Sequence, residues 1–439
     1  MIEERKVRDA LELLGPGTRL DISSERTGLL RYARSRVTAQ HDEERLRVRV
    51  RVTRDGRVAG GTLESLETGA VRALAERLQD ALSCLPQGGT AGAVRPAAAQ
   101  GEPAVPAVAP ATVAAGAGER YAWFSAIRDG LGGRADLGGA VRHDVIGRVV
   151  ADHDGLYRSE TLTKASLQAV ASRDGRSASA RIVHRDAARI SVDGIAERLL
   201  DDLAPLPTGD PLTGTCRVLL RPQAVVTLLT TYAYAALGAA GYAQGRTAAA
   251  GRMGERIVSE LLTLTDDAAD PAGLPSGFDV EGTCRSRTPL IERGVLRGVV
   301  SDLERAPVTG GRSTGHGVPI GWRFGADPSP SHILLDAGDA DETELMAGCG
   351  DGQVISRLDY LRVLHPKDTL VTGTTRDATY WLKDGRIAAW APPVRLTFRM
   401  DEVLSAVIGV GRERERGEAV FMESAVAPAL LVEAGPFSA

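Results

Sequence analysis

Residues 222–245, PQAVVTLLTTYAYAALGAAGYAQG, contain no charged side chain, although a quarter of the whole chain is charged. The run is long enough to cross a bilayer, for which about 20 apolar residues suffice. A spanning helix would be richer in Leu, Ile and Phe, whereas this run includes Gln, Thr and Gly. Its Ala and Leu residues suit a helix that packs against protein on every side. The run therefore predicts a helix in the centre of a hydrophobic core, and no membrane contact.

The composition of the 439 residues predicts an ordered protein of two domains. The length exceeds what one ordinary core supports. The hydrophobic content of 43% argues against disorder, and a net charge of −4 argues against a nucleic-acid partner. The charged start, MIEERKVRDALELL, does not fit a secretory signal. Four cysteines without a CxxC pair favour a reducing, cytoplasmic location over a cysteine zinc site: Cys84, Cys216, Cys284 and Cys349.

An internal repeat organises residues 1–205. The segment TRDGR at 53–57 and the segment SRDGR at 172–176 each place Asp-Gly between alternating residues, which is a hairpin signal. Each hairpin is followed by a helix-like segment with the shared letters AERL. The repeat predicts an α+β class, with an N-terminal α/β domain made of two strand–hairpin–helix halves.

Residues 86–118 separate the two halves and consist mainly of Pro, Ala and Gly with almost no charge. Such a segment has too few large apolar side chains to form a core. We expect a linker or a long surface loop that is dispensable for folding.

From residue 206 to residue 439 the pattern changes to many short strands. Turns are predicted at Arg293-Gly294 and at Asp384-Gly385, and Gly and Pro recur at short intervals. This pattern predicts a mostly-β C-terminal domain, sandwich or barrel-like, with one or two helices.

The Gly-rich segment GGRSTGHGVP, residues 310–319, is the best local candidate for a site. Residues 311–315 fit the letters of a G-x-S-x-G nucleophile elbow, but that motif needs a following helix. Gly317 and Pro319 prevent a helix from starting there. The candidates are Ser313, Thr314, Gly315 and His316, whose loop either faces a ligand or forms a tight turn without one.

Two other acidic and histidine pairs allow competing interpretations. Asp266 and Asp267 suit either a metal or the capping of a turn, and capping is the commoner role. His143 and Asp144 are neighbours on a predicted strand, so their side chains point to opposite faces. We therefore expect His143 to be a surface histidine and not part of a site.

Six C-terminal stretches, in this order, resemble a known family: GRMGERIVSELLTLTDD, GLPSGFDVEGTCRSRTPLIERGVLRGVVSD, GGRSTGHG, LMAGCGDGQVISRL, TRDATYWLKDGRIA and AVIGVGRERE. They are similar to the TldD/PmbA family of zinc metalloproteases and their partner subunits. The N-terminal LLRYARSRVTAQHDEERLRVRVRVTRDGRVAGG also resembles that family. The likeness covers nearly all of the chain except the Pro/Ala/Gly-rich segment.

The resemblance implies what the uncharged helix has lost. In the catalytic branch of the family, the corresponding helix carries H-E-x-x-x-H, two zinc-binding histidines and a general-base glutamate, and a cysteine near the C-terminus is the third ligand. This chain has no His between His184 and His316 and no Glu between Glu197 and Glu255. Near the expected cysteine it has Phe421 and Met422 instead.

The resemblance therefore implies a zinc-free PmbA/TldE-like subunit without catalytic or metal-binding residues of its own. Its implied partner is a TldD-like subunit that bears HExxxH and zinc, in a heterodimer or a larger assembly. The implied substrate is an extended peptide or a peptide-derived amide, and Ser313–His316 would shape the chamber around it.

Two alternatives stay open from the sequence. The complex could be dedicated to one amide hydrolysis or peptide-maturation step in natural-product (antibiotic) biosynthesis. The chain could also be a stand-alone hydrolase with another nucleophile, for example Ser313 with His316, although such a pair normally needs a third orienting group.

Overall fold

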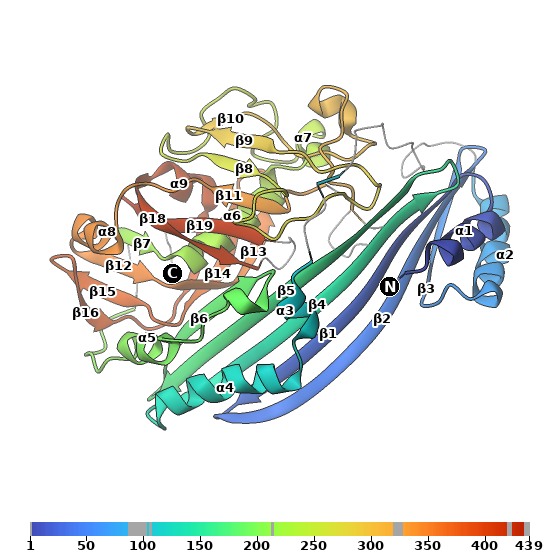
Figure 1. The fold of residues 1–439 in the computed structure, drawn as a ribbon. Coiled ribbons are helices and arrows are strands. Elements are labelled where there is room, and N and C mark those ends of the chain that lie inside the picture. Colours follow the sequence, from blue (N-terminus) through green and yellow to red (C-terminus); the bar gives the residue numbers. More distant parts are fainter. Residues whose placement is uncertain are drawn as a thin grey trace.

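The computed structural model describes residues 2–86, 103–104, 108–211, 215–318, 328–418 and 424–433. An N-terminal unit is built on one long antiparallel sheet, and a C-terminal unit is built on two sheets of shorter strands (Figure 1). The predicted boundary at residues 205–206 falls between α5 (Ile195–Asp202) and β7 (Arg217–Leu220). The mixed architecture confirms the predicted α+β class.

The N-terminal sheet has the strand order β3-β2-β1-β4-β5-β6, so its two halves meet at β1 and β4. The strands are β1 (Thr18–Ala33), β2 (Arg36–Arg54), β3 (Arg57–Leu63), β4 (Asp136–Asp152), β5 (Tyr157–Arg173) and β6 (Arg176–His184). The predicted hairpins are present, and their turn residues Asp55-Gly56 and Asp174-Gly175 all have positive φ, as type I′ turns require. The internal repeat is therefore confirmed.

Helices cover one face of this sheet at both of its ends (Figure 1). The first half contributes α1 (Glu4–Leu14) and α2 (Thr68–Cys84), and the second contributes α4 (Ala117–Leu131) and α5. Leu20 and Ile22 of β1 pack with the first pair, and Leu30 and Tyr32 pack with the second. These four positions differ by even numbers and share a face. Odd-numbered residues of β1 face the C-terminal unit, where Arg19 and Asp21 lie beside Glu281.

His143 does not lie on the surface, which corrects the prediction. It is 3% exposed and contacts Trp123 of α4 edge-on, with 5.2 Å between the ring centroids. Asp144 on the opposite face is also buried. His143 and Asp144 do point to opposite faces of the sheet, as predicted. Both side chains are nevertheless buried, because helices cover one face and other parts of the chain cover the opposite face.

The prediction that residues 86–118 form a linker or a long surface loop is wrong for the helical part of this segment. Residues Pro110–Ala114 form α3, where Thr112 is 1% exposed. Its hydroxyl donates to the carbonyl of Arg185 (2.8 Å) and accepts from the N–H of Ala187 (2.8 Å). A small polar side chain thus anchors this segment to the N-terminal unit. Residues 87–102 and 105–107 lie outside the described residues.

The C-terminal unit contains two open sheets. The larger has the order β10-β9-β8-β11-β19-β7-β12-β15-β16, with β18 paired to β19, and the smaller has the order β13-β14-β17. The larger sheet comprises β7, β8 (Leu264–Asp266), β9 (Thr288–Glu292), β10 (Val295–Leu296), β11 (His332–Leu335), β12 (Gly352–Ile355), β15 (Tyr380–Lys383), β16 (Arg386–Trp390), β18 (Val407–Gly417) and β19 (Ser424–Val432). The smaller comprises β13 (Arg357–His365), β14 (Leu370–Arg376) and β17 (Arg395–Arg399). The sheets do not close into a barrel.

The uncharged run forms α6 (Pro222–Ala236) and the short helix α7 (Ala239–Ala243). Proline at the start of α6 suits the first helical position, where its missing N–H costs nothing. Gly238 separates the two helices, and a Cβ there would lie 2.3 Å from the carbonyl oxygen of Pro328. The remaining helices of the unit are α8 (Glu342–Cys349) and α9 (Met400–Ser405).

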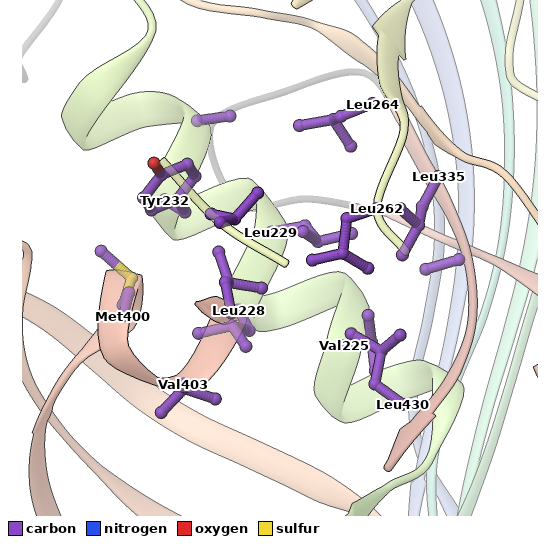
Figure 2. Close-up of a cluster of buried hydrophobic side chains, with 14 of the residues drawn as sticks. Val225, Leu228, Leu229, Tyr232, Leu262, Leu264, Leu335, Met400, Val403 and Leu430 are labelled. Carbon is purple, nitrogen blue, oxygen red and sulfur yellow. The ribbon is translucent and has the colours of Figure 1, made fainter. Parts of the chain in front are cut away.

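Helix α6 lies in the hydrophobic core and contacts β19 of the larger sheet and β13 of the smaller one. Figure 2 shows Val225, Leu228, Leu229 and Tyr232 of α6 among side chains from other segments of this core: Leu262, Leu264, Leu335, Met400, Val403 and Leu430. The prediction of a core helix is confirmed. Among the helices within the described residues, none has the length and apolarity needed to cross a membrane.

Candidate functional site

The side of α6 that is less deeply buried lines a cavity of about 350 Å³. Gln223, Thr227, Thr230 and Thr231 lie along it at helical spacing. Each threonine hydroxyl donates to a carbonyl four residues earlier, for example Thr230 to Val226 (2.8 Å) and Thr231 to Thr227 (2.7 Å). These bonds use the hydroxyl protons, so the remaining oxygen lone pairs can accept hydrogen bonds from a ligand.

Charged residues from three other segments line the same cavity. They are Arg181 of β6, Arg357, Asp359 and Arg362 of β13, and Glu418 after β18. Most of these charges are already paired. Arg357 donates to Asp377 (2.7 Å), Asp359 accepts from Arg376 (2.9 Å), and Lys164 donates to Glu418 (2.5 Å).

Lys164 shows how these pairs set the charge of the wall. Burial alone would lower the pKa of its ammonium group, but the nearby carboxylates of Glu418 and Asp144 raise that pKa above its ordinary value. Lys164 therefore stays protonated near neutral pH, and its ammonium group is paired with the Glu418 carboxylate on the cavity wall.

Two of these charges are not paired in this way: Arg362 is exposed and lies over the ring of Tyr360, and Arg181 is half-buried. In the part of the chain that the structure describes, the guanidinium of Arg181 makes no hydrogen bond and no ion pair. Burial and the neighbouring Arg357 lower the pKa of Arg181. Arginine nevertheless stays protonated in proteins. The cavity therefore contains a half-buried positive charge that the carboxylates of Glu418, Asp359 and Asp377 influence without a direct bond.

Tyr360 lies beside the cavity and is 71% exposed. Its φ of 50° is unusual for a residue with a large side chain, and the ladder between β13 and β14 is irregular at this point. The guanidinium carbon of Arg362 lies 5.8 Å from the centre of its ring. An exposed ring held on a strained backbone is typical of a contact surface.

The side chains that α6 directs to the cavity do not fit a zinc ion. Zinc in proteins is bound by imidazole, thiolate and carboxylate groups, whereas α6 offers one amide and three hydroxyls here. The carboxylates of Asp359 and Glu418 are held by Arg376 and Lys164. Within the described ranges, no group of three or more His, Cys, Asp and Glu side chains is arranged to hold a metal.

The predicted loop residues lie in a separate polar network and do not line the α6 cavity. Ser313 is 6% exposed, and its hydroxyl donates to the carbonyl of Ser301 (3.1 Å) and accepts from the N–H of Gly315 (3.1 Å). Thr314 also bonds Ser301, through both the backbone N–H (2.7 Å) and the carbonyl (3.0 Å) of that residue. The loop is thus tied to the segment that follows β10.

Gly315 is the residue that lets this loop close. Its φ is +79°, and a Cβ there would lie 2.6 Å from the carbonyl oxygen of Cys284.

His316 connects the loop to Asp266 of β8. One ring nitrogen, Nε2, lies 3.0 Å from the carboxylate of Asp266, and the other, Nδ1, lies 2.9 Å from the hydroxyl of Thr314. The second carboxylate oxygen of Asp266 accepts from the N–H groups of Ser331 (2.5 Å) and His332 (2.9 Å). Burial alone would raise the pKa of Asp266, but His316 and these bonds hold it well below its usual range.

This network bears on two of the sequence interpretations. Asp267 accepts from the N–H of Ala269 (3.0 Å), as expected of a capping residue, while Asp266 has a different role as the partner of His316. Ser313 is not bonded to His316, whose two ring nitrogens are occupied by Thr314 and Asp266. The base–nucleophile contact that a stand-alone serine hydrolase needs is therefore not formed between these residues.

Sequence reasoning missed the cavity wall. On β6, Ala178 and Ala180 are buried on one face of the sheet. The alternation of side chains along a strand therefore predicts that Arg181 lies on the opposite face. No local pattern indicates that β13 and α6 meet it there. On α6, the polar residues Gln223, Thr227 and Thr231 recur every four residues, and this spacing predicts that they share one face of the helix.

Comparisons with known proteins agree with this architecture. The model of the PmbA/TldA metallopeptidase C-terminal domain matches residues 213–437, just over half of the chain. Metalloproteases of Archaeoglobus fulgidus and Methanothermobacter thermautotrophicus are 29% and 27% identical, over 39% and 48% of this chain. An uncharacterized protein of Methanocaldococcus jannaschii is 32% identical over 33% of it. The aligned parts span only 35–46% of these relatives.

Solved structures share the whole fold at low sequence identity. The crystal structure of TldE from Thermococcus kodakarensis has a TM-score of 0.85 and 18% identity, and covers 99% of both chains. A putative modulator of a DNA gyrase from Thermotoga maritima has a TM-score of 0.82 and 19% identity, over 98% of this chain and 99% of that one. With the match of the family model over residues 213–437, the chain belongs to the TldD/PmbA family.

Proposed function

We propose that the chain is the zinc-free, non-catalytic subunit of a heteromeric TldD/TldE-type metalloprotease. One observation carries the proposal. The cavity side of α6 presents Gln223, Thr227, Thr230 and Thr231, and the family resemblance implies that α6 is the counterpart of the helix that bears H-E-x-x-x-H in the catalytic branch. Amide and hydroxyl groups can bind a peptide by hydrogen bonds, but they do not supply the ligands of a catalytic zinc site.

In this proposal the chain binds and orients substrate, and the partner subunit performs the hydrolysis. Zinc in the partner would activate the attacking water. The present chain contributes the wall of a chamber through the α6 cavity, with Tyr360 beside it as a contact. The loop of Ser313, Thr314, Gly315 and His316 does not line this cavity, and in this proposal it shapes a separate part of the chamber.

An extended peptide or peptide-derived amide is the substrate class that the fold favours. Strand β6 is the edge of the N-terminal sheet. Its outer side is contacted where the carbonyl of Ser177 accepts from the N–H of Ala378 (2.8 Å) and where that of Val183 accepts from Arg416 (3.0 Å). Between these points, next to Arg181, the edge can pair with an added strand.

The test is a reconstitution with a family member that bears HExxxH. Hydrolysis of a quenched fluorescent peptide is measured for this chain, for the partner and for their mixture, each with and without a chelator. We expect cleavage by the mixture well above either subunit alone, and its loss on chelation. Chelator-resistant cleavage by the isolated chain would contradict the proposal and return attention to another nucleophile.

A variant of the cavity separates a role in substrate binding from a role in assembly. Replacing Thr227 by Leu fills the polar side of α6 with an apolar side chain. The mixture should still form a complex in size-exclusion chromatography, but its KM for the peptide should rise. Thr247→Ala, a buried threonine that does not line the cavity, is the matched control.

A further inference from the structure

A second groove adjoins the α6 cavity and is strongly basic. It has a volume of about 530 Å³ and is formed by the end of β6, by α5 and by β18. Six basic side chains line it: Arg181, His184, Arg189, Arg198, Arg414 and Arg416. The acidic side chain among its lining residues is Glu415. Over the whole chain the charges of the two signs are nearly balanced, with 53 Lys and Arg residues and 57 Asp and Glu residues, so a groove lined by five arginines and one glutamate is unusual.

Most of the arginines in the groove have no carboxylate partner. Arg416 donates to the neutral carbonyl oxygens of Ala272, Val183 (3.0 Å) and Pro271 (3.2 Å). For Arg181, Arg189 and Arg198, no side-chain hydrogen bond or ion pair exists with any residue that the structure describes. Their positive charge is therefore available to a ligand.

Glu415 is one carboxylate against five arginines, so the groove keeps a positive net charge. The carboxylate of Glu415 accepts a hydrogen bond from the side-chain amide of Gln223 (2.9 Å), on the boundary between the basic groove and the α6 cavity. His184 adds little charge near neutral pH, because burial and the nearby Arg416 lower its pKa. The positive field of the groove thus comes from arginines, which stay charged at every relevant pH.

Arg181 lines both volumes and so joins the basic groove to the α6 cavity. The two spaces lie next to the edge strand β6, where an extended chain can run from one to the other. A single small anion would occupy only one of them. An extended peptide with acidic side chains would fill both, and its carboxylates would meet the arginines in their preferred two-pronged geometry.

We propose that this basic groove binds the carboxylates of an acidic peptide, and that Arg181 is the specificity-determining contact between the groove and the α6 cavity. The inference rests on the proposed function, since it names the substrate class that the subunit selects. Acidic peptides are expected to bind this chain, and neutral peptides of the same length are expected to bind weakly.

Binding to the isolated full-length chain tests this directly. Three fluorescently labelled peptides of one length are compared by anisotropy: one with acidic side chains and an amidated C-terminus, one with neutral side chains and a free C-terminus, and one with neither charge. We expect the first to bind about tenfold or more tightly than the third, as charge-assisted bonds allow. The second peptide separates a terminal carboxylate from side-chain carboxylates as the source of the anion.

Substitutions locate the site. Arg181→Gln and Arg198→Gln should each weaken the acidic peptide several-fold and leave the neutral peptide unchanged. Arg47→Gln is the control, because Arg47 is an exposed arginine of β2 outside both volumes. Thermal unfolding of each variant shows whether it is folded. Equal affinity for acidic and neutral peptides, or unchanged affinity in both groove variants, would overturn the proposal.

Two further results distinguish this inference from the proposed function. A single-stranded oligonucleotide that bound more tightly than the acidic peptide would contradict the assignment to peptide. A reconstituted complex that cleaved neutral and acidic peptides with the same KM would refute the groove but leave the subunit assignment standing. If the mixture cleaved no peptide while the isolated chain still bound the acidic peptide, the subunit assignment would be refuted and the groove would stand.

Discussion

Asp266 is the residue on which the loop around His316 depends. It is fully buried, and its two carboxylate oxygens bond His316, Ser331 and His332. A buried pair of this kind stabilises a fold only while both partners are present, because removing one leaves a buried polar group without its counterpart. The loop GGRSTGHG is therefore held by the carboxylate of Asp266. From the sequence alone, turn capping was the favoured role for this residue.

Replacing Asp266 by Asn should lower the free energy of unfolding by about 3 kcal/mol, within the range for breaking a buried pair. Urea denaturation measures this loss. The control is Asp267→Asn, whose amide oxygen can still accept from the N–H of Ala269, so its loss should be below about 1 kcal/mol. Equal effects of the two variants would contradict the distinct roles assigned to these neighbours.

The contribution of Asp266 also has a defined pH dependence. Its pKa is lower in the folded chain than in the unfolded chain, so the folded state favours the ionised form. The stabilisation is fully present above the ordinary aspartate pKa of about 4 and is lost as pH falls below that value. The gap in stability between wild type and Asp266→Asn should therefore narrow at low pH, which denaturation at several pH values would show.

Individual residues also show where sequence reasoning fails. The rule that neighbours on a strand point to opposite faces is correct for His143 and Asp144, but exposure depends on what covers each face. The four loop candidates were found from glycine content, yet their partner Asp266 is 50 residues away from His316. Arg181 had no local signal of function, because its importance arises from its position between two cavities, where it bonds no side chain that the structure describes.

At the scale of elements, α6 was the most predictable part of the molecule. A helix without charge has to be buried, and its neighbours in Figure 2 come from segments far away in the chain. The hairpins were predictable because Asp-Gly turns are local. The short helix α3 was not, because its attachment through Thr112 is a tertiary contact inside a segment of linker-like composition.

The two sides of α6 should respond differently to substitution. Leu228→Ala removes a fully buried side chain and should cost about 2–5 kcal/mol of unfolding free energy. Thr231→Ala on the cavity side should cost less than about 1 kcal/mol, since alanine favours helix. Chemical denaturation compares them. A Thr231 variant as destabilised as the Leu228 variant would mean that the cavity side is part of the packed core.

At the scale of the whole molecule, the two units share a hydrophobic cluster, in which Leu199 and Tyr380 are both buried, and they also meet through polar groups. Glu281 of the C-terminal unit lies beside Arg19 and Arg51 of the N-terminal sheet and accepts from the N–H of Leu303 (2.8 Å). Burial and the nearby Asp279 raise the pKa of Glu281 to about 7. This contact was invisible in the sequence, because Glu281 is more than 200 residues from both arginines.

The sign of this effect is opposite to that of Asp266. Because the pKa of Glu281 is higher in the folded chain, its contribution to stability is fully present below the ordinary glutamate pKa of about 4.3 and is lost as pH rises towards 7. Glu281→Gln cannot ionise and should keep the acceptor for Leu303. Its Tm should therefore fall less than that of the wild type between pH 5 and 8. Glu12→Gln, at an exposed position of α1, should leave the wild-type profile unchanged.

The metal content of the purified chain tests the central claim, a zinc-free subunit, most directly. The chain is expressed alone and together with an HExxxH-bearing partner, desalted, and measured by elemental analysis. The account predicts no stoichiometric zinc in the chain alone and about one zinc per pair in the complex, lost when the partner's histidines are replaced. About one tightly held zinc in the isolated chain would contradict it, because a metal site would then have to be built from residues other than those that α6 presents.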